Sequence, residues 1–354
     1  MVYSKKRKDC RLVKKIKLED VAAAAGVSPT TVSRVLNNRG YISGKTRKRV
    51  EDAMDEAGYV PNEVARSLFA SKTNIVGIIF PNTVNAFYGE MVTRLENYLS
   101  QEGYKVLLCN TDDEPEKEKE HLKMLQSSQV DGLIVGSRNN PGEVYSKAYR
   151  AIVSIDRYIS DKAPNIRSDN YQGAMLAAEY LLKKECRQMA LFVGSPPDEL
   201  VRGDLRMKGF LDALLKHNRQ ATVCPVGFDK SEDIQRQLIS RHLEERPDID
   251  GIFATGDTLA AIINSTALQK NRHIEIVGFD GTKTFTTLCP HISTIAQPIN
   301  DIAKTAVHVL TKMMAGQYKG IKDEYILPVK LIERTPGMGD GKPSIPNRKD
   351  VRPI

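Results

Sequence analysis

The chain has 354 residues, of which 41% are hydrophobic and 27% are charged. This length favours two or more folding units, and the sequence contains neither an apolar run long enough to cross a bilayer nor the apolar core of a secretory signal. Five widely spaced cysteines lack metal or redox spacing, which is typical of free thiols in a reducing compartment. We therefore expect a cytoplasmic protein of several units, without a metal or cofactor.

The positive charge lies at one end of the chain. The net charge is +8. Residues 1–73 hold 16 Lys and Arg against 8 Asp and Glu, whereas the remaining residues hold 36 of each kind. A basic end on a neutral body predicts a polyanionic partner for that end, with DNA or RNA favoured over a membrane. Residues 1–15 are expected to form a disordered basic tail.

Three short helices are predicted between residues 16 and 61. An apolar pattern of helical period ends at Gly26, which is typical of the residue after a helix. Ser28 is a good capping residue and Pro29 suits the first position of a second helix. A third helix is expected over residues 45–57. Two helices joined by a short turn with glycine predict a helix-turn-helix, although an ordinary helical hairpin has the same pattern.

The start of the third helix contains Gly44-Lys45-Thr46, the last three residues of a phosphate-binding loop. That loop needs four residues between its glycines and a preceding buried strand. Gly40 is one position too close, Arg39 stands where the glycine is required, and no strand pattern precedes them. We therefore place the triplet in the first turn of the helix. An exposed basic cluster is expected there, formed by Lys45, Arg47, Lys48 and Arg49.

The head of the chain contains four specific motifs, Asp20-Val21-Ala22, Ala25-Gly26-Val27-Ser28, Thr31-Val32-Ser33-Arg34-Val35-Leu36-Asn37 and Gly58-Tyr59-Val60-Pro61-Asn62. In these motifs the chain resembles the LacI-type repressors. The resemblance runs from about residue 16 to residue 335, and residues 38–43 look most like the sucrose-operon repressors of low-GC Gram-positive bacteria. It implies a homodimer that binds a pseudo-palindromic operator in the bacterial cytoplasm, associated with the nucleoid.

The resemblance also implies which residues contact DNA. The second helix is expected in the major groove, where Pro29 and Thr30 match a pair of base-reading positions and Arg34 matches another. Residues 62–73 resemble a hinge helix that forms on DNA, with Leu68 wedged between base pairs, although the residues by themselves favour a plain linker. Further DNA contacts are expected from Ser28, Thr31, Ser33, Asn37, Lys45, Lys48 and Asn62.

From residue 74 onward, short apolar runs alternate with helical stretches. This alternation predicts an α/β fold with parallel sheets covered on both faces. Residues 130–134 and 249–253 repeat each other, which indicates two similar doubly wound subdomains, a periplasmic-binding-protein-like body. Strands are expected at 75–80, 105–109, 132–135, 152–155, 189–193, 251–254 and 274–279. Helices are expected at 87–101, 116–127, 171–184, 206–216 and 258–269.

The resemblance implies that the chain crosses three times between these subdomains. One subdomain is expected to hold about residues 74–170 and 299–322, and the other about 171–298 and 323–335. The tail 336–354 is rich in proline and glycine and is expected to be disordered. It lacks leucine heptads, so we expect a dimer, in which two heads meet two half-sites.

Residues that follow strands are ligand candidates, because doubly wound folds bind ligands at the carboxyl ends of strands. Asp156, Asp257 and Asp280 each follow an expected strand, and Arg206 opens an expected helix. Carboxylates and guanidinium groups suit a polyhydroxylated ligand, although any one of these residues could instead form a strand-end ion pair. The effector pocket expected from the pattern and the resemblance contains Phe87, Tyr88, Asp156, Arg206, Phe228, Asp257, Asp280 and Gln297.

The sequence departs from the family pattern at two places. Thr255-Gly256-Asp257 stands where many members have Gly-Asn-Asp, and Leu200 replaces an arginine of the purine-type repressors. Both departures argue against a purine ligand. We expect a sugar such as sucrose, fructose or a related sugar; an aldose, a ketose and a disaccharide all stay open, as does a sugar phosphate.

Enzymatic function is disfavoured. The six histidines form no metal-binding pair, and neither a nucleophile elbow nor a dinucleotide fingerprint is present. A sugar-responsive repressor is therefore the leading hypothesis. The alternatives are a global catabolite regulator with a phosphoprotein corepressor, a sugar-binding transport protein and a Rossmann-like enzyme. The basic head and the missing secretory signal argue against the transport protein, and the missing phosphate-binding fingerprint argues against the enzyme.

Overall fold

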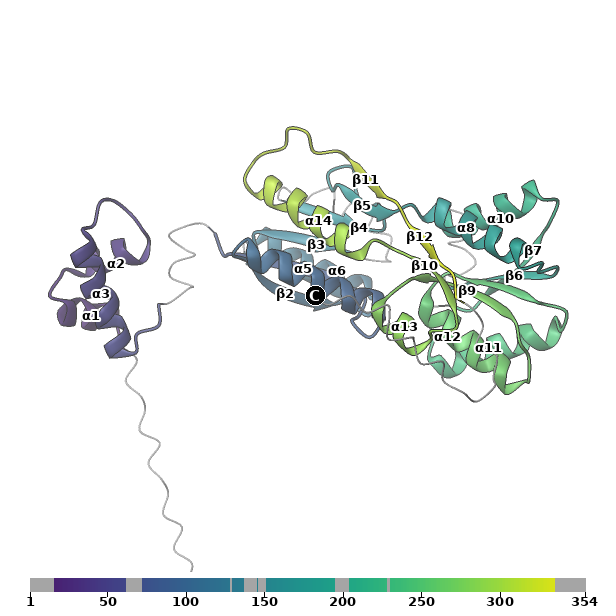
Figure 1. Ribbon diagram of the computed structural model, residues 1–354. Coiled ribbons are helices and arrows are strands. Elements are labelled where there is room, and N and C mark those ends of the chain that lie inside the picture. Colours follow the sequence, from purple (N-terminus) through teal and green to yellow (C-terminus); the bar gives the residue numbers. More distant parts are fainter. Residues whose placement is uncertain are drawn as a thin grey trace, which may run out of the picture. The chain divides into compact units, whose positions relative to one another are not determined.

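The computed structural model describes residues 16–61, 72–127, 129–136, 145, 151–194, 204–227 and 230–334. The chain divides into two units, Met1–Thr73 and Asn74–Ile354, which we call the head and the body (Figure 1). The expectations for the basic tail at 1–15, for most of the hinge at 62–71 and for the tail at 336–354 lie outside the described residues.

The head contains three helices, α1 (Leu18–Ala25), α2 (Pro29–Leu36) and α3 (Gly44–Ala57). α1 ends at Gly26, whose φ of 60° is left-handed. Ser28 caps α2, because its Oγ accepts a hydrogen bond from the backbone N–H of Thr31 at 3.2 Å. The Gly44-Lys45-Thr46 triplet lies in the first turn of α3, so the helical interpretation is confirmed.

The three helices enclose one small core. Val21, Val32 and Val50 contribute one fully buried side chain from each helix. The smaller buried members of this core are Ala22, Ala25, Val35 and Ala53. The apolar residues that recur with helical period in the sequence therefore form the surface on which the three helices contact each other. The helix-turn-helix prediction is confirmed.

The body is built on two six-stranded sheets, ordered β11-β5-β4-β3-β1-β2 and β12-β10-β9-β8-β6-β7. All neighbouring strands are parallel except β10 and β12. The first sheet consists of β1 (Ile75–Phe80), β2 (Lys105–Asn110), β3 (Gly132–Val135), β4 (Ala151–Ile155), β5 (Asn165–Ser168) and β11 (Glu324–Leu327). The second consists of β6 (Met189–Val193), β7 (Ala221–Pro225), β8 (Gly251–Ala254), β9 (Glu275–Asp280), β10 (Ser293–Ala296) and β12 (Lys330–Ile332).

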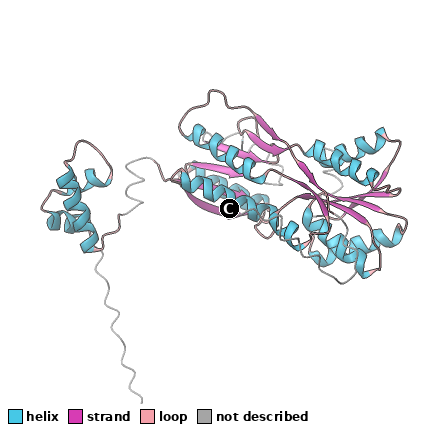
Figure 2. Cartoon of the chain, viewed as in Figure 1, coloured by secondary structure: helices cyan, strands magenta, loops and turns pink. Residues whose placement is uncertain are grey.

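Helices cover both sheets, as Figure 2 shows in cyan against magenta strands. The helices of the first subdomain are α5 (Ala86–Gln101), α6 (Pro115–Gln126) and α14 (Ile299–Met314). Those of the second are α8 (Asn170–Lys183), α10 (Leu205–Lys216), α11 (Glu232–Glu245), α12 (Asp257–Gln269) and α13 (Lys283–Leu288). The α/β fold class and its two doubly wound sheets are thus confirmed, and each predicted strand or helix agrees within one residue at either end.

The chain passes between the two subdomains at three places. β5 leads into α8 at residues 168–170, β10 leads into α14 at 296–299, and β11 leads into β12 at 327–330. β11 pairs with β5 of the first sheet. The boundary expected at residues 322–323 is therefore wrong by a few residues, because the chain adds one more strand to the first sheet before its last crossing.

The repeated segments at 130–134 and 249–253 have the same role in both sheets. The Asp131 carboxylate accepts a hydrogen bond from Asn74 N at 2.8 Å, immediately before β1. The Asp250 carboxylate accepts from the two backbone N–H groups immediately before β6, at 2.8 Å each. A Cβ on Gly132 or Gly251 would lie within 3 Å of a packed side chain. The repeat therefore has a structural role: its aspartate joins neighbouring strands, and its glycine leaves room for close packing.

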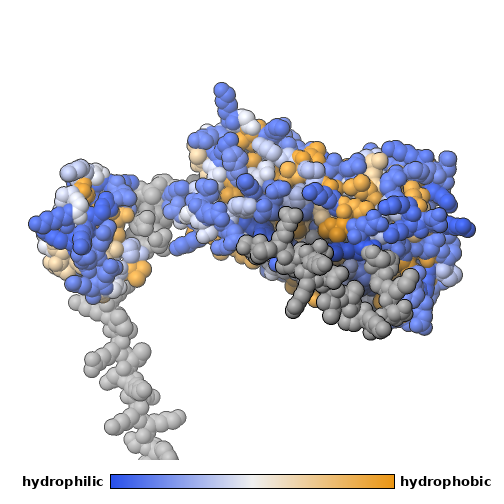
Figure 3. All heavy atoms as spheres, in the orientation of Figure 1, coloured by the Kyte–Doolittle hydropathy of each residue, from blue (hydrophilic) through white to orange (hydrophobic). Residues whose placement is uncertain are grey.

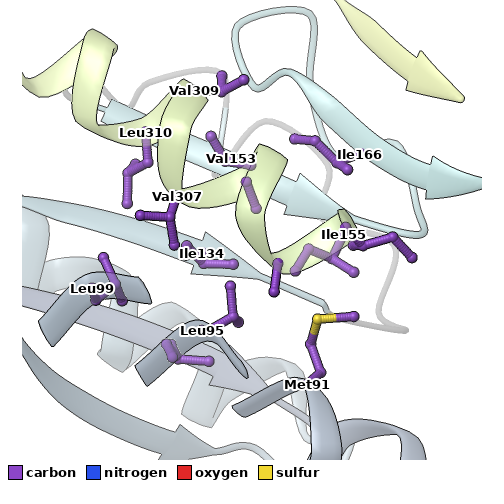
Figure 4. Packing of buried hydrophobic residues seen from close by; sticks show 14 of the residues in the cluster. Met91, Leu95, Leu99, Ile134, Val153, Ile155, Ile166, Val307, Val309 and Leu310 are labelled. Carbon is purple, nitrogen blue, oxygen red and sulfur yellow. The ribbon is translucent and has the colours of Figure 1, made fainter. Parts of the chain in front are cut away.

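The core of the first subdomain lies between its sheet and two helices. Figure 4 shows Met91, Leu95 and Leu99 of α5 and Val307 and Leu310 of α14 gathered with Ile134 and Val153 of the strands. Two further clusters pack on the two faces of the second sheet. Each subdomain therefore has its own core, and the crossing segments join two separately packed bodies.

The molecular surface is mainly hydrophilic on the face seen in Figure 3, with hydrophobic atoms in scattered patches. Within the part of the chain that the structure describes, no helix is long and apolar enough to cross a membrane.

Candidate nucleic-acid interface and ligand site

The second helix of the head presents one polar face. Val32 and Val35 point into the core, whereas Pro29, Thr30 and Arg34 are exposed. Thr30 and Arg34 are four residues apart on a helix, so their side chains lie on one face, one turn from each other. The structure thus brings the predicted base-reading side chains together on the solvent side of α2.

Four other predicted DNA contacts take part in hydrogen bonds at the ends of α2. Ser28 Oγ and Thr31 Oγ1 lie 2.9 Å apart at its start. At its end, Asn37 Nδ2 donates to the carbonyl oxygen of Ser33 at 2.8 Å. These residues therefore define where the helix begins and ends.

The basic cluster on α3 is exposed at three of its four residues, and Arg47 is half-buried. Lys45 and Lys48 are exposed, as expected. Arg49 also donates from Nη2 to the carbonyl oxygens of Ala25 at 2.7 Å and Gly26 at 3.1 Å. Carbonyls at the end of a helix lack partners within the helix, so this guanidinium caps α1. Arg49 is exposed as expected and in addition supports the end of α1, and its contact with a DNA phosphate stays a prediction.

Several sequence candidates lie outside the described residues. They are Asn62, Leu68, Leu200 and Phe228.

The body brings charged side chains together where its strands end. Asp156 follows β4 of the first subdomain, Asp280 ends β9 of the second, and Arg206 lies in the first turn of α10. Arg206 Nη2 is 3.7 Å from Asp156 Oδ2, and Nη1 is 3.6 Å from Asp280 Oδ1. Asp280 has a φ of 125°, a strained value that clusters at functional sites. One guanidinium thus bridges carboxylates from both subdomains.

Three residues that sequence reasoning missed hold this guanidinium in place. Arg206 Nε donates to Asn170 Oδ1 at 3.0 Å, and Nη1 donates to the Thr255 carbonyl oxygen at 2.7 Å. The guanidinium carbon lies 3.8 Å from the centre of the Phe279 ring, a cation–π contact. Asn170 also donates to Asp156 Oδ1 at 2.8 Å. All three lie at or beside strand ends, the one signal that could have identified them.

Gln297 links the site to two crossing segments. Its Nε2 donates to Asp280 Oδ1 at 2.7 Å, and its Oε1 accepts from Ser168 Oγ at 2.7 Å. Ser168 ends β5 at the first crossing, and Gln297 lies on the second. Burial raises the pKa of Asp280 to about 6, while Arg206 and the Gln297 amide favour its ionised form.

Asp257 lies beneath the site and has other partners. It is 2% exposed, and its carboxylate accepts from Thr282 N at 3.1 Å and from Thr294 Oγ1 at 2.6 Å. Burial and the nearby Asp280 carboxylate raise its pKa to about 8. These contacts connect α12 to the loop after β9, which is a structural role.

Phe87 and Tyr88 lie in the first turn of α5, at the carboxyl end of β1. Phe87 is buried and its ring centre is 5.4 Å from that of Tyr88, which in turn lies 5.1 Å from Phe80. Because all strands of the first sheet are parallel, these aromatic residues lie at the same edge as Asp156. Phe87 is a member of the first core and Tyr88 packs against it, and their contact with a ligand stays a prediction.

The charges of this site have a chemical consequence. Asp156 and Asp280 face the single guanidinium of Arg206, so these three groups carry a net negative charge above the pKa of Asp280. Carboxylates accept hydrogen bonds from hydroxyl groups, whereas an anionic ligand would be repelled by the excess carboxylate. Among the described residues no cluster of His, Cys, Asp and Glu suits a metal ion.

Comparisons with known proteins agree with both halves of this architecture. Residues 17–62 match the model of the bacterial regulatory proteins of the lacI family. Residues 73–307 match the model of the periplasmic binding proteins and sugar binding domain of the LacI family.

Whole-length relatives are also found. A sucrose operon repressor of Pediococcus pentosaceus is 38% identical over 324 residues, which cover 90% of this chain and 98% of the relative. The lac repressor dimer bound to operator and the anti-inducer ONPF has a TM-score of 0.79 at 26% identity, covering 91% of this chain and 99% of that one. A LacI-type regulator of Alkaliphilus metalliredigens, in complex with D-xylulofuranose, has a TM-score of 0.67 at 32% identity, covering 74% and 98%.

Proposed function

The chain belongs to the LacI family of bacterial regulatory proteins, and from this premise we propose that it represses a sugar-utilisation operon and is controlled by a small neutral sugar. The observation that carries the proposal is the Arg206 guanidinium, held between Asp156 and Asp280 of the two subdomains. A ligand placed there contacts both subdomains at once. Its binding therefore depends on their arrangement, which is the requirement for a ligand that changes a conformational equilibrium.

The charge of the site supports a neutral sugar over a phosphorylated one. Arg206 already has two carboxylates, one carbonyl and one amide as partners, so little of its charge is left for a phosphate. Sucrose, fructose or a related sugar is the class we favour. The relatives point the same way, since one is a sucrose operon repressor and another was solved with a ketose.

The head supports operator recognition by α2. We assign base reading to Thr30 and Arg34, with an apolar contact from Pro29, and phosphate contacts to Lys45 and Lys48. We also propose that two copies of the chain bind a pseudo-palindromic operator in the cytoplasm, because one head reads only one half-site.

The experiment is an operator-binding assay with and without ligands. An operator is first selected from a random DNA library, and its affinity is then measured with sucrose, D-fructose, D-ribose and fructose 6-phosphate. We expect at least one neutral sugar to change the affinity and fructose 6-phosphate to have little effect. A response to the phosphate alone would contradict the neutral-sugar class. A response that requires an added phosphoprotein would favour the catabolite-regulator alternative, and no operator binding would contradict the function as a whole.

A further inference from the structure

The loop between β9 and α13 directly follows the carboxylate of the ligand site, and it packs against the segment in which the chain makes its second crossing. Asp280, the last residue of β9, pairs with Arg206. The next residue is Gly281, whose φ is 64°, and a Cβ there would lie 2.4 Å from the Cα of Ala296. The loop is therefore packed directly against the strand that leads into the second crossing, and little room is left for it to move alone.

The next two residues, Thr282 and Lys283, donate their backbone N–H groups to carboxylates. Thr282 N donates to Asp257 Oδ2 at 3.1 Å, within the second subdomain. Lys283 N donates to Glu90 Oε2 at 2.9 Å, and Glu90 lies on α5 of the first subdomain. Residues 280–283 therefore run from the ligand site to a contact between the subdomains.

The chemistry of the Glu90 contact is favourable. Lys283 is the first residue of α13, where backbone N–H groups have no partner within the helix. A carboxylate at this end also interacts well with the helix dipole. Arg94 Nη2 lies 3.6 Å from Glu90 Oε1, on the other oxygen of the carboxylate. The side chain of Glu90 is 22% exposed, so water screens the contact only in part.

We propose that the Glu90–Lys283 contact is a latch that holds the two subdomains in the arrangement required for sugar binding, and this inference rests on the proposed function. Arg206 of the second subdomain reaches Asp156 of the first only while the subdomains stay close. A second bond across the same boundary raises the fraction of molecules in that arrangement. The observed affinity scales with that fraction, so Glu90 is a positioning residue for the sugar site.

The backbone donor can be removed with one substitution. Lys283→Pro deletes the N–H that Glu90 accepts, and proline is well tolerated at the first position of a helix. The preceding residue, Thr282, has a ψ of 150°, which is the conformation that a following proline requires. Lys283→Ala is the matched control, because it removes the side chain and keeps the N–H. Glu90→Ala removes the acceptor.

The measurement is a double-mutant cycle on ligand affinity, with D-fructose and sucrose as probes in calorimetry of the full chain. Glu90→Ala and Lys283→Pro should each weaken binding by about three- to tenfold, the effect of losing one hydrogen bond that water screens in part. The double variant should lose no more than either single variant, and Lys283→Ala should bind like the wild type. Additive losses, unchanged affinity in Glu90→Ala, or an equal loss in Lys283→Ala would overturn the latch.

A readout without ligand separates the latch from the proposed function. Spin labels at the exposed positions Asn97 on α5 and Lys208 on α10 report the distance between the subdomains. We expect one narrow distance distribution in the wild type and Lys283→Ala, and a broader one in Glu90→Ala and Lys283→Pro. Identical distributions in all four proteins would overturn the latch even where sugar binds. If neither sugar binds the wild type, the proposed ligand class fails and these distances alone decide the latch.

Discussion

The head and the body place their recognition residues in opposite surroundings. In the head, Thr30 and Arg34 project from α2 into solvent, while a separate set of valines forms the core. In the body, Arg206 and Asp280 are largely buried and bond to each other and to the crossing segments. On the proposed assignment, recognition and stability are therefore separable in the head, whereas in the body the same side chains would serve both. This difference predicts which substitutions change specificity alone and which also change folding.

The largest effect is expected from Arg206→Ala, which would break the coupling of stability and recognition in the body. Removing the guanidinium leaves the Asp280 carboxylate buried without its cation, a loss of about 3 kcal/mol or more at pH 7. The change should lower the thermal unfolding temperature of the body and abolish the sugar response. Arg206→Lys, which keeps the charge, serves as the control and should recover part of the stability. Unchanged unfolding in Arg206→Ala would show that the ion pairs do not contribute to folding.

The corresponding change in the head is Thr30→Ala, which should alter recognition only. We expect the preference at one base pair of each half-site to change by about 1–3 kcal/mol. The free energy of unfolding should stay within about 0.5 kcal/mol, because the side chain is exposed. Affinities for a panel of operator variants provide the measurement. An unchanged ranking of the panel would remove Thr30 from the base-reading set.

The stability of the body should depend on pH through Asp257, a dependence that the head is not expected to share. Its folded-state pKa of about 8 lies above the ordinary value, so the folded body binds more protons than the unfolded chain. Its contribution to stability is therefore present at low pH and is lost as the pH rises through about 8. Asp257→Asn resembles the protonated form and should flatten this dependence, with a difference in unfolding temperature of about 2–4 °C between pH 6 and pH 9. Parallel curves for the two proteins would contradict the raised pKa.

The smallest effects are expected from substitutions of two neighbouring basic residues of α3, one of which should change stability and the other operator binding. Arg49→Ala should destabilise the head by about 1 kcal/mol, because two carbonyls at the end of α1 lose their donor. Lys48→Ala should leave stability unchanged, weaken binding to all operators alike and reduce the salt dependence by about one unit. Chemical denaturation and salt titrations of operator binding distinguish the two. The reverse pattern would exchange their roles.

Much of the fold followed from periodicity in the sequence. Long apolar runs such as β1 and strongly amphipathic helices such as α5 were placed within one residue. The short strands β5 and β10 were missed, because four residues with mixed polarity carry little pattern of their own and are defined by pairing with their neighbours. β11 was assigned to the wrong subdomain for the same reason, since only its pairing with β5 reveals its sheet.

The candidate site could be predicted only in part. Strand-end positions identified Asp156 and Asp280, which the structure joins through Arg206. The same rule also selected Asp257, whose carboxylate instead holds Thr282 and Thr294. Position along a strand does not determine which way a carboxylate points, since that depends on partners distant in sequence. The bonds of Arg49 to the end of α1 could not be predicted for the same reason, because its acceptors lie more than twenty positions away in the sequence.

The central claim is that the strand-end cluster of the body binds a neutral sugar and thereby controls operator binding. The most direct measurement is a titration of operator affinity against D-fructose and sucrose for the wild type and Asp280→Asn. The wild type should change its operator affinity by about 5–150-fold on saturation with the sugar. Asp280→Asn should bind the operator normally without sugar and show less than about a twofold response, because its amide offers one acceptor where the carboxylate offers two. A variant that keeps the full response at unchanged sugar concentrations would contradict the claim.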